Sequence, residues 1–138
     1  MEIKQISVFL ENNAGRLAEV TRVLADAGIN LRAISIADTA DFGILRLIVD
    51  KHEEALKALK AGGFTTRLTD VAAVEIEDTP GSLARVMDLF RKTNVNIEYL
   101  YASLEGKSGK AVVIFKLEDH QKGLQIFKDN GLSMVESF

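Results

Sequence analysis

The sequence contains no cysteine, which excludes disulfides, thiolate metal sites and a cysteine nucleophile. It also has no excess of basic residues: positions 1–69 carry nine Lys and Arg against nine Asp and Glu, and positions 70–138 carry eight against eleven. This balance argues against a protein that holds nucleic acid through its phosphates. No apolar run approaches the ~20 residues of a membrane helix, and the N-terminus lacks the apolar core of a signal peptide. We therefore expect a cytoplasmic protein with neither nucleic-acid nor membrane partners.

Apolar side chains are plentiful in this chain. They make up 47% of the 138 residues, and charged residues make up 27%, which is close to ordinary globular usage. A chain of this composition has enough apolar surface to fold. Its length allows one ordinary domain or two very small ones.

An internal repeat decides between these two possibilities. Positions 12–20 read Asn-Asn-Ala-Gly-Arg-Leu-Ala-Glu-Val, and positions 78–86 read Asp-Thr-Pro-Gly-Ser-Leu-Ala-Arg-Val. The shared Gly, Leu, Ala and Val coincide at a shift of 66 positions, from Gly15 to Gly81. Further along the shift becomes 68, from His52 to His120, and we place the two additional residues in the loop 105–110. The sequence therefore predicts two units, 1–70 and 71–138.

Each unit has the pattern of a β-α-β-β-α-β fold. Runs of β-branched and apolar residues predict strands, apolar residues at helical spacing predict helices, and Asp41–Gly43 predicts a turn. The predicted strands are Ile3–Leu10, Leu31–Ala37, Ile44–Val49, Phe64–Leu68, Ala72–Ile76, Ile97–Leu104, Lys110–Leu117 and Leu132–Ser137. The predicted helices run from about Leu17 to Gly28, around Leu56 and Leu59, and over Gly81–Thr93 and Asp119–Asn130. This order predicts an α+β fold of two tandem ferredoxin-like βαββαβ units, with antiparallel sheets and both helices on one face.

The sheet face without helices also carries apolar residues. The segment Ala111–Phe115 is apolar on both faces, as is Leu47–Val49, whereas a strand with one wet face alternates. Tyr99 and Tyr101 point to the same face. Two interpretations follow: loops cover this face, or a second sheet packs on it, most simply in a homodimer.

The repeated motif resembles the ACT domain family. The motif consists of Gly-x-Leu at the start of the first helix, preceded by Asn-x-Ala or Asp-x-Pro, and Gly-Ile-Asn or Asn-Val-Asn at its end. The resemblance covers essentially the whole chain twice, as in small bacterial proteins that consist of two ACT domains. It implies a regulatory, allosteric role and a small effector, usually an amino acid, bound at a domain–domain interface.

The resemblance also implies which residues bind that effector. They belong to the loop after the first strand of one domain and to the start of the second strand of its neighbour. In this sequence they are Asn12, Ala14, Gly15, Arg16, Leu17 and Asn30 in the first unit, and Asp78, Gly81, Ser82, Leu83 and Asn96 in the second. Ala14 stands where the family usually has proline, which is present as Pro80, and Asp78 stands where serine-binding members have asparagine.

The chemistry of such a site follows from the residues themselves. A helix start offers unpaired N–H groups to a carboxylate, and glycine lets a ligand approach the backbone. Asn and Asp oxygens accept hydrogen bonds from an ammonium group. The alternative is that Asn12 and Asp78 only cap their helices and that Asn30 and Asn96 are ordinary turn residues.

Other functional classes find less support. His52 and His120 are the only histidines and are expected to be exposed first-turn residues, so no metal site is predicted. Tyr99 and Tyr101 only partly match the aromatic platform of ferredoxin-like RNA-binding domains. An acylphosphatase needs a phosphate-binding loop rich in arginine, and Arg16 alone does not make one. We find no catalytic constellation and no cofactor motif.

The sequence thus favours a non-enzymatic, amino-acid-binding regulatory protein. The alternatives are a subunit that regulates a metabolic enzyme without its own ligand and, third, an acylphosphatase-like enzyme.

Overall fold

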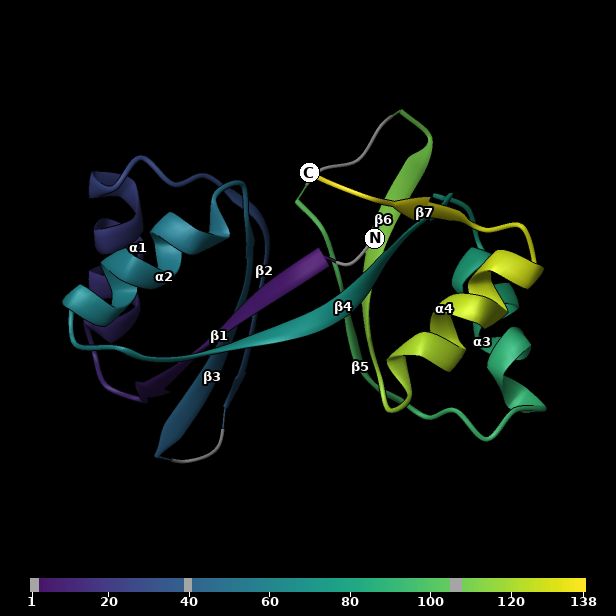
Figure 1. The fold of residues 1–138 in the computed structure, drawn as a ribbon, viewed down its shortest axis with the longest axis horizontal. Helices are drawn as coiled ribbons and strands as arrows, with labels where there is room; N and C mark the ends of the chain where they lie inside the picture. The colour runs from purple at the N-terminus through teal and green to yellow at the C-terminus, as the bar shows by residue number, and fades with distance from the viewer. Residues whose placement is uncertain (1–2, 39–40, 105–107) are drawn as a thin grey trace. The chain divides into compact units, whose positions relative to one another are not determined.

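The fold is that of the computed structural model, which describes residues 3–38, 41–104 and 108–138 (Figure 1). Its elements are β1 Ile3–Glu11, α1 Arg16–Asp26, β2 Leu31–Asp38, β3 Phe42–Val49, α2 His52–Ala61, β4 Thr65–Glu77, α3 Ser82–Arg91, β5 Ile97–Ala102, β6 Lys110–Leu117, α4 His120–Asp129 and β7 Ser133–Val135. The predicted α+β fold of two tandem βαββαβ units is confirmed. The chain divides into two compact units, which we call the N-terminal unit, Lys4–Thr69, and the C-terminal unit, Asp70–Ser137. Ile3 groups with the latter and Phe138 with the former.

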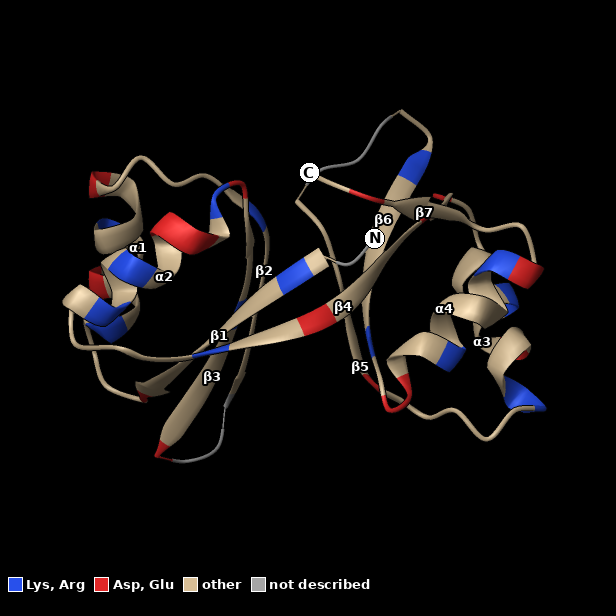
Figure 2. Cartoon of the chain, viewed as in Figure 1, with Lys and Arg blue, Asp and Glu red and all other residues tan. Residues whose placement is uncertain are grey.

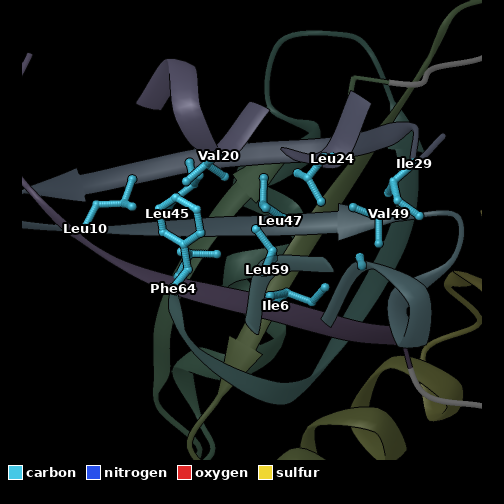
Figure 3. Packing of buried hydrophobic residues seen from close by; sticks show 12 residues of the cluster. Ile6, Leu10, Val20, Leu24, Ile29, Leu45, Leu47, Val49, Leu59 and Phe64 are labelled. Carbon is cyan, nitrogen blue, oxygen red and sulfur yellow. The ribbon is translucent and has the colours of Figure 1, made fainter. Parts of the chain in front are cut away.

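The N-terminal unit packs two helices against one face of its strands. β3 pairs antiparallel with β1 on one side and with β2 on the other. Alternate residues of β1 and β3 point to the helices, where Val20 and Leu24 of α1 and Leu59 of α2 meet them (Figure 3). The spacing of four between Val20 and Leu24 keeps both on the buried stripe of α1. The strand residues of this core are Ile6, Val8, Leu10, Leu45, Leu47 and Val49.

The C-terminal unit repeats this arrangement with an aromatic core. β6 pairs antiparallel with β4 and β5, and β7 pairs with β4. The ring centroid of Phe127 in α4 lies 5.2 Å from that of Phe90 in α3 and 5.3 Å from that of Phe115 in β6. Val86 of α3 and Leu124 of α4 join the same cluster. Both helices thus cover the face of the sheet to which Phe115 points.

One prediction about the strands is wrong. The segments Phe64–Leu68 and Ala72–Ile76 were expected to be separate strands, but β4 runs without interruption from Thr65 to Glu77. Thr69-Asp70-Val71 contains neither proline nor glycine, so nothing in the local sequence ends the extended backbone there. The last strand of one unit is therefore continuous with the first strand of the next.

The remaining differences lie at the ends of elements. Phe42 and Gly43 belong to β3 and not to a turn, because Phe42 pairs with Glu11 and Gly43 pairs with Leu10. The final strand covers only Ser133–Val135. Helix α3 ends at Arg91, short of the predicted Thr93. Of the loop 105–110, to which the sequence assigns two additional residues, positions 105–107 lie outside the described residues.

Charged residues of both signs are spread over each unit. Blue and red segments are interspersed on the helices and strands in Figure 2. This pattern matches the sequence expectation that neither half is basic. Among the described residues, no helix is long and apolar enough to cross a membrane.

Candidate functional site

The two units begin their first helix in the same unusual way. The residue before α1 is Gly15 with φ 88°, and the residue before α3 is Gly81 with φ 88°. This left-handed conformation is one that glycine adopts without strain and other residues rarely adopt. Neither helix start has a side-chain cap hydrogen bond. Gly15 and Gly81, and not Asn12 and Asp78, occupy the capping positions of these helices.

The loop before each of these helices is held by a backbone hydrogen bond at the corresponding position in the two units. The Asn12 amide donates to the Asp41 carbonyl oxygen at 2.9 Å, and the Asp78 amide donates to the Gly109 carbonyl oxygen at 3.0 Å. The donors are 66 positions apart and the acceptors 68, which are the two shifts of the sequence repeat. Each bond fixes a predicted site residue against the neighbouring hairpin.

Most of the predicted ligand-binding residues are exposed. They are Asn12, Ala14, Gly15, Leu17 and Asn30 in the N-terminal unit and Asp78, Gly81, Leu83 and Asn96 in the C-terminal unit. The position after the capping glycine differs between the units. Ser82 is only 6% exposed. Arg16 is half-buried, with its guanidinium 4.8 Å from the ring centroid of Phe64 and 2.6 Å from a carboxylate oxygen of Glu19.

Within one unit, the loop residues and the second-strand residue lie far apart. Asn30 follows the C-terminal end of α1, and Gly15 precedes its N-terminal end. Eleven residues of α-helix, Arg16–Asp26, span roughly 16 Å. Asn30 is bound to Asp50, whose side chain accepts from the Asn30 amide at 3.1 Å. A site that combines Gly15 with an asparagine at a strand start therefore needs two different units, and this combination stays a prediction.

The apolar residues on the helix-free face are buried within one chain. Ile114 and Ile48 are 0% and 1% exposed, and Tyr101 is 9% exposed. On the N-terminal unit, Phe9 and Phe42 are 42% and 60% exposed. These exposed fractions do not test the homodimer that the sequence indicated, which stays a prediction.

The two histidines differ from the sequence expectation. His52 and His120 are the first residues of α2 and α4, and both are half-buried, where exposed residues were predicted. In the described part of the chain, no group of three or more His, Asp or Glu side chains is placed to hold a metal ion. The histidines therefore give no support to a metal centre.

Alanine at either capping glycine is expected to destabilise the fold. Gly15→Ala and Gly81→Ala each force a Cβ into the left-handed region, at a cost of about 1–2 kcal/mol in the free energy of unfolding. Gly43→Ala is the matched control, since Gly43 has no positive φ and its Cβ would meet its neighbours at 3.5 Å or more. Urea unfolding of the three variants measures the difference, and equal losses in all three would show that alanine pays no penalty for the left-handed conformation at Gly15 and Gly81.

The family is decided by the match of the whole chain to a known domain pair. A family model described as an ACT domain pair matches residues 1–137. The chain belongs to the ACT domain pair family. This agrees with the fold, in which each ACT unit has two helices on one face of its strands (Figure 1).

Individual relatives agree with this assignment. The ACT pair is 41% identical to protein BT0572 from Bacteroides thetaiotaomicron, with a TM-score of 0.91 over 98% of this chain and 92% of that one. The regulatory subunit of aspartate kinase from Thermus thermophilus, at 23% identity, has the same fold, with a TM-score of 0.69 over 95% and 94% of the two chains. The acetolactate synthase small subunit of Buchnera aphidicola is 30% identical over 79 residues, 56% of this chain. The ACT pair spans about half the length of that curated relative.

Proposed function

We propose that this ACT pair is a regulatory protein without catalytic activity of its own, and that it binds an α-amino acid as its effector. The observation that carries the proposal is the uncapped helix start behind a left-handed glycine, present at the same place in both units. An effector regulates such a protein by binding one of its conformations more tightly than another.

The chemistry of the helix start matches an amino acid. The amides of Arg16 and Ser82 donate to the carbonyl oxygens of Asn13 and Thr79 in the preceding loops. The next amides of α1 and α3 have no carbonyl acceptor in their own helix and suit a carboxylate. Asn12 carries both donor and acceptor atoms for a zwitterion, whereas Asp78 only accepts and suits the ammonium group. Both side chains are exposed and lie next to a helix start.

A second candidate function is that of an interaction subunit that regulates a metabolic enzyme and binds no small molecule. The 30% identity to a protein named as the small subunit of acetolactate synthase favours it. The third sequence hypothesis, an acylphosphatase-like enzyme, has only Arg16 in its favour. The Arg16 guanidinium forms an ion pair with Glu19 and lies over the Phe64 ring.

Thermal unfolding in the presence of each of the twenty amino acids tests the proposed function. A ligand present at a hundred times its Kd stabilises the folded state by about 2.7 kcal/mol, which raises Tm by several degrees. We expect such a rise, dependent on ligand concentration, for one amino acid or a few of related shape. If all twenty leave Tm unchanged at millimolar concentration, the amino-acid proposal is wrong and the interaction subunit takes its place.

A further inference from the structure

The two units are joined by a strand that belongs to both of them. β4 runs without interruption from Thr65 to Glu77, and the boundary between the units, from Thr69 to Asp70, lies inside it. Thr69 and Asp70 are half-buried and Val71 is 0% exposed. Linkers between independent domains are instead exposed, flexible and rich in glycine, proline or polar residues. The backbone at the boundary is therefore strand and not linker.

The C-terminal half of β4 is a central strand of its unit. Ala72–Glu77 pairs with β6 on one side, and Ala73–Glu75 pairs with β7 on the other. Ala72 and Val74 belong to the core of the C-terminal unit and are 2% and 0% exposed. A displacement of this half of β4 therefore disturbs two strand pairings and the core of the C-terminal unit together.

The N-terminal half of β4 begins beside the first helix of the N-terminal unit. Phe64, the residue immediately before β4, is 6% exposed and belongs to the core of that unit. The guanidinium of Arg16, the first residue of α1, lies 4.8 Å from the Phe64 ring centroid. A cation over the face of an aromatic ring is attracted to it. The helix start behind Gly15 is therefore in contact with the residue that leads into β4.

The other end of β4 leads into the helix start of the C-terminal unit. Asp78 follows Glu77 directly, and its amide donates to the Gly109 carbonyl oxygen at 3.0 Å. Gly81, three residues further along, precedes α3. One strand thus connects the two helix starts, with one of them at each of its ends.

We propose that β4 couples the two units, so that they unfold together and an effector bound at the helix start of one unit also stabilises the other. Each unit has about 70 residues, a size at which an independent core is marginally stable. Coupling between two sites is reciprocal, so either unit transmits its state to the other. For the effector, this inference rests on the proposed function, whereas the coupling itself is tested without an effector.

Tyrosine fluorescence allows the C-terminal unit to be observed alone. The chain has no tryptophan, and its two tyrosines, Tyr99 and Tyr101, both lie in β5. Far-ultraviolet circular dichroism follows the helices and strands of both units. Coincident transitions from different probes are the mark of a single cooperative unfolding. We expect the two urea unfolding curves of the unmodified chain to have the same midpoint, and two separate midpoints would overturn the coupling.

Leu59→Ala places a destabilising change in the N-terminal unit alone. Leu59 is 0% exposed in the core of that unit, and its truncation removes apolar burial. We expect the tyrosine midpoint to fall by as much as the circular dichroism midpoint. A tyrosine midpoint equal to that of the unmodified chain would contradict the coupling. If the variant unfolds completely without urea, the coupling requires that the tyrosine signal is also that of the unfolded chain.

An insertion at the boundary tests whether β4 carries the coupling. Gly-Ser-Gly between Thr69 and Asp70 makes the boundary a flexible linker, and we expect Leu59→Ala then to leave the tyrosine midpoint unchanged. The matched control is the same insertion between Lys92 and Thr93, after α3, with which the tyrosine midpoint is expected to follow Leu59→Ala as before. Equal behaviour of the two insertions would show that β4 is not the coupling element. If the boundary insertion prevents folding, Leu59→Ala in the uninterrupted chain decides.

The effector separates this inference from the proposed function. An amino acid that gives binding heat is expected to raise both midpoints equally. If it raises only one of them, the coupling is wrong and the proposed function stands. If none of the twenty amino acids binds, the proposed function fails and Leu59→Ala alone decides the coupling.

Discussion

Replacing Phe127 with alanine is expected to lower the free energy of unfolding by about 3–5 kcal/mol, since large-to-small changes in a core lose apolar burial and leave a cavity. Phe127 is 0% exposed. Its ring centroid lies 5.2 Å from that of Phe90 and 5.3 Å from that of Phe115, so one substitution removes two aromatic contacts. Equilibrium unfolding in urea measures the loss.

Phe42→Ala is the control for this prediction. Phe42 is 60% exposed, and its truncation is expected to cost less than about 1 kcal/mol. A loss below about 1 kcal/mol for Phe127→Ala would contradict the packing of α4 against β6 and α3.

Valine in place of Gly123 is expected to destabilise the C-terminal unit by about 2–3 kcal/mol through overpacking. Gly123 is buried on α4, and a Cβ built there would lie 2.2 Å from Cδ1 and 3.1 Å from Cγ of Leu117. Leu117 is itself 0% exposed in β6, so its side chain has little room to yield. The better helix propensity of valine offsets only about 0.5 kcal/mol.

Lys122→Val serves as the matched control, because Lys122 is the exposed neighbour of Gly123 on the same helix. It is expected to change the free energy of unfolding by less than about 1 kcal/mol. Urea unfolding of both variants gives the comparison. Equal stabilities would mean that α4 is not held against β6 at Gly123.

The fold could be predicted from the sequence because the strand and helix patterns of each unit are local, and because they occur twice in the chain. The richness of β1 in Ile, Val and Phe and the helical spacing of Val20 and Leu24 are local signals, and they were correct. The joining of two predicted strands into β4 was missed because a continuous strand and two adjacent strands have the same local composition. The capping glycines were recognised as a motif, but their left-handed conformation depends on how the preceding loop is bound to the hairpin.

The candidate site was predicted less completely than the fold. The helix-start loops were identified, whereas the hydrogen bonds that hold them to the carbonyl oxygens of Asp41 and Gly109 were not. These bonds join residues that lie about 30 positions apart, and no local pattern of the sequence indicates them.

Titration calorimetry with each of the twenty amino acids tests the central claim most directly. The ACT pair is proposed to sense an α-amino acid at a helix start behind a left-handed glycine, and both units have such a start. Saturable binding heat is therefore expected for one amino acid or a few of related shape. The absence of binding heat for all twenty at millimolar concentration, together with an unchanged Tm, would contradict amino-acid sensing.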